Sequence, residues 1–118
     1  MTHVEFISFL FELEVNSHIA HLKAQSQSYG EHIALDEVYN NVKEFRDEYA
    51  EILQAEEILS GYPQIQVRES VPPVILIKNA ITSCKRYRST LVESHLQNEI
   101  DTLTSSLSKS LYKLKNLK

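Results

Sequence analysis

Four residues between positions 32 and 51 have the types and the spacing of a metal site: His32, Asp36, Asp47 and Glu51. On an α-helix, which turns by about 100° per residue, these four positions share an arc of about 100°. Imidazole nitrogens and carboxylate oxygens together suit iron, manganese or zinc. The alternative is that the four side chains are solvated charges on one exposed helix face.

The length of such a helix decides how a metal could be held. With a rise of about 1.5 Å per residue, His32 and Glu51 lie about 30 Å apart, so no single ion can be bound by both ends. Two antiparallel copies of the helix about a two-fold axis would bring His32 and Asp36 of one chain beside Asp47 and Glu51 of the other. The pattern therefore predicts a site shared between subunits, and self-association into at least a two-fold dimer.

The elements that must position these residues are helices. The chain of 118 residues contains only two glycines and three prolines, which indicates long uninterrupted helices and an all-α class. Its length predicts one domain, residues 1–118. The apolar spacing predicts a four-helix bundle. Its helices are expected at about 2–27, 31–60, 74–92 and 94–116, and the connection 61–73 is expected to cross the end or side of the bundle.

The second of these helices has the clearest apolar stripe. It consists of Leu35, Val38, Val42, Phe45, Tyr49 and Ile52. This stripe is centred about 160° from the face that carries the carboxylates, so the carboxylates are expected to point away from their own bundle. That placement suits a dimer interface and a plain solvent face equally. In the third helix, Cys84 falls at an apolar position and is predicted to be a small core residue.

Composition excludes several classes of protein. Residues 31–57 hold nine acidic side chains against two basic ones, and this acidic balance disfavours nucleic-acid binding. The longest apolar run, residues 71–77, contains two prolines and is far shorter than the about 20 residues of a membrane helix. A lone cysteine and a start without a secretory signal predict a reducing, cytoplasmic environment.

Three segments resemble the ferroxidase region of Dps-like mini-ferritins, in the ferritin-like superfamily. They are His-Leu-Lys at 21–23, His-Ile-Ala-Leu-Asp-Glu-Val-Tyr at 32–39 and Phe-Arg-Asp-Glu-Tyr-Ala-Glu at 45–51. The resemblance implies a ferritin-like four-helix bundle with an iron site between two-fold-related subunits. Carried over by position, His21 is the first-helix ligand, His32 and Asp36 complete one half-site, and Asp47 and Glu51 supply the other.

The resemblance also implies a chemistry, the oxidation of Fe(II) by oxygen or peroxide at a di-iron or mono-iron site, with manganese and zinc as alternative metals. The stretch from His21 to His32 is one residue shorter than is usual in that family, so His18, one turn earlier, is a substitute for His21. The ending Leu-Tyr-Lys-Leu at 111–114 resembles small ferritin-like proteins of tailed bacteriophages. A phage origin would place the protein in the cytoplasm of a bacterial host.

A second hypothesis needs no metal. A helical bundle without catalytic activity could bind a host or viral protein through its acidic face or through the connection 61–73. The two hypotheses differ in one observable, because only the first requires stoichiometric metal. Whether the protein is an enzyme depends on which of the two holds.

Overall fold

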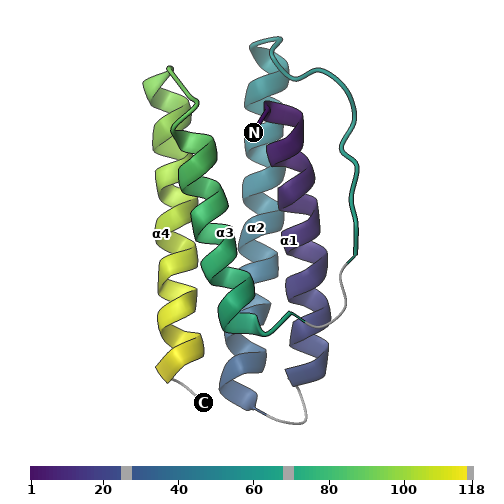
Figure 1. Cartoon of the computed structure of the whole chain (residues 1–118), viewed down its shortest axis with the longest axis vertical. Helices are drawn as coiled ribbons and strands as arrows, with labels where there is room; N and C mark the ends of the chain where they lie inside the picture. Colours follow the sequence, from purple (N-terminus) through teal and green to yellow (C-terminus); the bar gives the residue numbers. More distant parts are fainter. Residues whose placement is uncertain (25–27, 68–70, 117–118) are drawn as a thin grey trace.

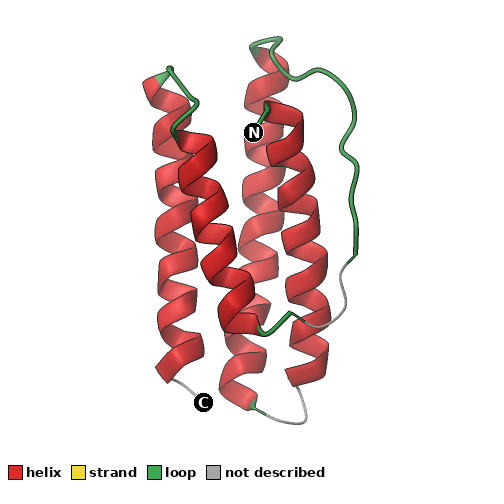
Figure 2. Ribbon diagram, in the orientation of Figure 1, coloured by secondary structure: helices red, strands yellow, loops and turns green. Residues whose placement is uncertain are grey.

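The computed structural model describes residues 1–24, 28–67 and 71–116. Over these ranges the chain forms four helices and no strand (Figures 1 and 2), which confirms the predicted all-α four-helix bundle. The helices are α1 (His3–Ala24), α2 (Tyr29–Ala55), α3 (Pro73–Arg88) and α4 (Ser94–Asn116). None of the described helices is long and apolar enough to cross a membrane.

The bundle consists of two helical hairpins. α1 packs along α2, α3 packs along α4, and α2 also packs on α4, whereas α1 and α3 pack together more loosely than these three pairs. Between the hairpins, the connection runs back along the outer side of α1 (Figure 1), so α2 and α3 point in the same direction. As far as Val67, the connection follows the side of the bundle. The backbone N–H of Gln64 donates to Ser8 Oγ at 3.0 Å, and that of Gln66 to Glu12 Oε1 at 2.9 Å.

Local chemistry accounts for where the helices begin. Thr2 precedes α1 and caps it. The Thr2 hydroxyl accepts a hydrogen bond from the Glu5 backbone N–H at 3.2 Å and donates one to the Glu5 carboxylate. Ser28 caps α2 by accepting from the Glu31 backbone N–H at 3.2 Å. Pro73 opens α3 at a position where proline's missing N–H costs nothing.

Two helices end earlier than the apolar spacing predicts. α2 ends at Ala55, not at Ser60, because Glu57 adopts the left-handed conformation with φ of 60°. The N–H of Ile58 then bonds the carbonyl of Leu53 at 3.0 Å, a Schellman closure. α3 ends at Arg88, not at Val92, where the hydroxyl of Thr90 donates to the carbonyl of Tyr87 at 2.7 Å. The first helix is described only to Ala24, so its predicted last turn, 25–27, lies outside the described residues.

The predicted apolar stripes form the core. In α2, Leu35, Val38, Val42 and Tyr49 are buried, and Phe45 and Ile52 are half-buried against them. Cys84 is fully buried, as predicted, and burial raises the pKa of its thiol to about 12.

One polar chain crosses this core. The Tyr49 and Tyr87 hydroxyls lie 2.7 Å apart, and the Tyr87 hydroxyl lies 2.7 Å from Nδ1 of His3 at the start of α1. Phe6 stacks on the Tyr87 ring with a centroid distance of 3.9 Å. Burial raises the pKa of Tyr87 to about 12 and also raises the pKa of Tyr49. Both phenols are therefore neutral hydrogen-bonding groups that join α1, α2 and α3.

Candidate metal centre

Two histidines face each other where α1 ends and α2 begins. The rings of His21 and His32 stack with a centroid distance of 3.7 Å and an interplanar angle of 20°. Nδ1 of His21 lies 2.7 Å from the carbonyl oxygen of His32, and Nδ1 of His32 lies 3.0 Å from the carbonyl oxygen of His21. Each imidazole is thus held by the backbone of the other helix.

These two bonds decide the tautomer of both rings. A carbonyl oxygen can only accept a hydrogen bond, so each Nδ1 must carry the proton and donate it. In a neutral imidazole the other nitrogen, Nε2, then has an available lone pair. Among the described residues, no hydrogen bond occupies Nε2 of His21 or His32. A backbone carbonyl behind the Nδ1–H is also the usual support of a metal-binding histidine.

His18 and Asp36 lie beside this pair and are linked through Tyr39. The His18 ring stacks on the Tyr39 ring at 4.1 Å, and the Tyr39 hydroxyl donates to Asp36 Oδ1 at 2.7 Å. That hydrogen bond raises the pKa of Tyr39. The ring of His21 meets Tyr39 edge-on at 5.3 Å and lies 6.0 Å from the ring of His18. Tyr39 is therefore at the centre of the cluster.

Asp47 and Glu51 lie elsewhere on α2. Eleven residues separate Asp36 from Asp47, which places them about 16 Å apart along the helix axis. Both distal carboxylates are exposed, with Asp47 at 58%. Oδ1 of Asp47 accepts from Nε and Nη2 of Arg46 at 3.2 and 3.1 Å. Glu51 forms no ion pair with any residue that the structure describes.

Arg46 is the buried centre of a second polar network. Its side chain is 8% exposed, and Nη1 pairs with Glu14 on α1. Its guanidinium carbon lies 3.9 Å from the centre of the Phe11 ring, a cation–π contact. Asp47 thus pairs with an Arg46 guanidinium that is already paired with Glu14. The Arg46–Asp47 bond competes with any metal for Oδ1 of Asp47.

The structure places four of the six predicted ligands at one end of the α1–α2 hairpin: His18, His21, His32 and Asp36. Asp47 and Glu51 remain apart from them within one chain, as the length of the helix required. Over residues 1–24, 28–67 and 71–116, no group of three or more His, Cys, Asp or Glu side chains is placed to hold a metal ion. One chain therefore offers at most a half-site.

Two residues of the site were not predicted. Tyr39 has a sequence signal, because it lies three positions after Asp36 and so on the same helix face. Arg46 has a weaker sequence signal: it lies next to the apolar stripe of α2, and a charge buried there requires a partner. That the partner is Glu14 depends on how α1 and α2 are rotated against each other.

Comparison with known proteins gives one result. Searches among curated proteins and solved structures find no match. One family model, described as a family of unknown function (DUF5856), matches residues 21–114. The match runs from the last turn of α1 into the last turn of α4 and includes His21, His32, Asp36, Asp47 and Glu51. Because it covers most of the chain, the protein belongs to this family of unknown function, DUF5856.

Proposed function

We propose that this protein binds a transition metal, with iron as the first choice, at a site that two copies of the chain share. The observation that carries the proposal is the reciprocal bonding of His21 and His32, which leaves one Nε2 lone pair on each of two stacked rings. A solvent-facing role alone would not require two Nδ1–H groups anchored in this way.

The donors of a complete site come from two chains. His21, His32 and Asp36 would hold the metal from one copy, and Glu51 and Asp47 would complete the shell from a second, antiparallel copy. Glu51 is the stronger of these two ligands because Asp47 is bonded to Arg46. The set fits a hard or borderline divalent ion such as Fe(II), Mn(II) or Zn(II). Bound iron would supply one-electron, ferroxidase-type chemistry.

The topology supports a ferritin-like interpretation. The long connection places α2 and α3 in the same direction (Figure 1), and a single long crossover is the arrangement of ferritin-like bundles. A reducing cytoplasm, which the lone buried Cys84 favours, is also where Fe(II) persists. If the chain is phage-encoded, this compartment is that of the bacterial host.

The test is an anaerobic Fe(II) titration by calorimetry, with the mass in solution measured alongside. We expect saturable binding at a fixed ratio of metal to chain, together with a doubling of mass. Glu51→Gln should abolish both the metal binding and the doubling of mass, because the exposed Glu51 side chain would bind only the metal in the partner's half-site. Glu48→Gln, an exposed acid of the same helix outside the ligand set, is the matched control and should bind as the wild type does. Absence of Fe(II), Mn(II) and Zn(II) binding would overturn the proposal.

A second function, that of a protein-binding module, is favoured by one observation. Three apolar side chains beside the histidines are exposed, namely Leu22 (60%), Tyr29 (67%) and Ile33 (42%). A contact face of this kind suits a host or viral protein as well as a second copy. In this case no metal would bind, and a host or viral partner captured by the wild type would be lost in Leu22→Glu/Ile33→Glu.

A further inference from the structure

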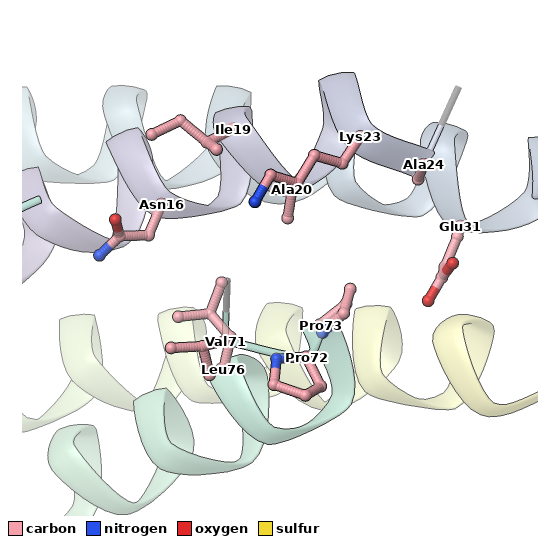
Figure 3. A pocket seen from close by; sticks show the side chains of 10 residues that line it. All are labelled: Asn16, Ile19, Ala20, Lys23, Ala24, Glu31, Val71, Pro72, Pro73 and Leu76. Atoms are coloured by element: carbon pink, nitrogen blue, oxygen red, sulfur yellow. The ribbon is translucent and has the colours of Figure 1, made fainter. Parts of the chain in front are cut away.

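The seam between α1 and α3 contains a groove that the proposed metal site does not use. α1 turns Ala20 and Ala24 toward the start of α3, and these short side chains leave space between the two helices (Figure 3). A pocket of about 280 Å³ lies there, with Ile19 on one wall and Pro72 and Leu76 on the other.

The groove continues toward the other end of α1. A second pocket of about 180 Å³ shares Asn16, Val71 and Leu76 with the first and extends to Phe9 and Leu13. The two pockets are neighbours along the seam; the first has mainly apolar walls, whereas Glu12, Asn79 and Ser83 also line the second. A volume of about 280 Å³ is slightly below the roughly 300–1,000 Å³ of sites for drug-sized ligands. An alkyl chain is small enough for a pocket of this volume.

Two charged side chains line the first pocket, one of each sign. The Lys23 side chain reaches along the groove toward Ala20, and Glu31 lies at the opposite end of the pocket (Figure 3). Lys23 forms no ion pair with any part of the chain that the structure describes. Its ammonium group is thus available to pair with an anion at the mouth of the groove.

We propose that the α1–α3 groove binds a single-chain amphiphile with an anionic head group, such as a medium-chain fatty acid. The alkyl chain lies between Ala20 and Leu76, and the head group pairs with Lys23. The metal proposal is independent of this one, because the groove lies on the other side of α1 from Tyr39.

The first experiment measures affinity against chain length by calorimetry, with hexanoate, octanoate, decanoate and dodecanoate below their micelle concentrations. Each methylene that enters the groove should raise the affinity about fourfold. The gain should stop once the groove is filled, so the affinity should reach a plateau within the series. The absence of saturable binding, or a steady rise without a plateau, would overturn the proposal.

Two substitutions test the placement. Lys23→Met should weaken decanoate binding by about two- to fivefold, as expected for an exposed ion pair, and leave 1-decanol binding unchanged. Lys43→Met removes an exposed lysine of α2 far from the groove and should change neither. Equal effects of the two lysine variants would contradict the head-group assignment. Decyl phosphate in place of decanoate shows whether the head group is a carboxylate or a phosphate.

A substitution that fills the groove tests where the alkyl chain binds. Ala20→Phe should fill the space opposite Leu76 and abolish binding of decanoate and decanol together, with circular dichroism confirming that the helices remain. Unchanged binding by a folded Ala20→Phe protein would move the alkyl chain elsewhere and refute the proposal.

Discussion

At the scale of single residues, the polar chain through the core is directional. Tyr49 is fully buried, and among the described residues its hydroxyl has only the Tyr87 hydroxyl as a partner. Tyr87 in turn has both Tyr49 and His3. Every proton finds an acceptor if Tyr49 donates to Tyr87 and Tyr87 donates to Nδ1 of His3. The middle hydroxyl is therefore the one whose loss leaves another buried group without a partner.

This asymmetry predicts that removing the two hydroxyls, one at a time, lowers the free energy of unfolding by different amounts. Tyr87→Phe should lower the free energy of unfolding by about 1–3 kcal/mol, because it leaves the buried Tyr49 hydroxyl unpaired. Tyr49→Phe should cost about 1 kcal/mol, because the Tyr87–His3 bond survives. Urea denaturation of both variants measures the difference. Equal costs would show that the Tyr49 hydroxyl finds another acceptor.

The same pair predicts the behaviour of the protein at high pH. A free tyrosine ionises at about pH 10, and burial raises the pKa of Tyr87 to about 12. A raised pKa means that the folded state favours the protonated phenol. The stability is therefore complete below about pH 10 and falls as the pH rises toward 12. Unfolding free energies measured across this range should decline less steeply for Tyr87→Phe than for the wild type.

At the scale of elements, the end of α2 is set by one strained residue. Glu57 occupies the left-handed region, with φ of 60°, where helix C-termini usually have glycine. The closure around it is complete, since Glu57 N bonds the carbonyl of Gln54 and Ile58 N bonds that of Leu53. The backbone hydrogen bonds thus stabilise this helix end, whereas the Cβ of Glu57 destabilises it.

Replacing this residue should stabilise the protein. Glu57→Gly should raise the free energy of unfolding by about 0.5–1 kcal/mol, because glycine has no Cβ to clash at positive φ. Glu57→Ala is the control and should not stabilise the protein, because alanine keeps the Cβ that clashes at positive φ. Thermal or urea unfolding of both variants tests the assignment. A loss of stability in Glu57→Gly would contradict it.

At the scale of the whole molecule, charge divides the bundle into two halves. The α1–α2 hairpin carries ten acidic side chains, three on α1 and seven on α2, against three basic ones. The α3–α4 hairpin carries seven basic side chains, four on α3 and three on α4, against two acidic ones. Lys113 bonds Glu37 at 2.6 Å, so opposite charges also tie α4 to α2, and His95 bonds Glu56, the residue that follows α2, at 2.9 Å.

This division predicts how the proposed dimer responds to ions. Two α2 faces brought together place acid against acid, so the metal-free chains should repel each other at low salt. Added salt screens that repulsion over about 10 Å at 0.1 M. We expect analytical ultracentrifugation to show a metal-free monomer at low salt, more dimer at higher salt, and dimer at low salt only when a divalent metal is present. A metal-free dimer that is most stable at low salt would contradict the proposed interface.

The sequence alone determined what is local or periodic. The apolar stripe of α2, the burial of Cys84 and the four-helix class follow from spacing along the chain, because a helix repeats its faces every 3.6 residues or so. The separation of Asp36 from Glu51 is equally a property of one helix. Helix ends were less predictable, since the positive φ of Glu57 depends on the hydrogen bonds that close around it and not on its residue type.

Only the tertiary structure decided which residues meet across helices. The stacking of His21 on His32, the pairing of Arg46 with Glu14 and the Tyr49–Tyr87 bond all join different helices. Each depends on the rotation and axial offset of one helix against another. Those two quantities come from the packing of all the core side chains together, and no spacing within a single helix contains them.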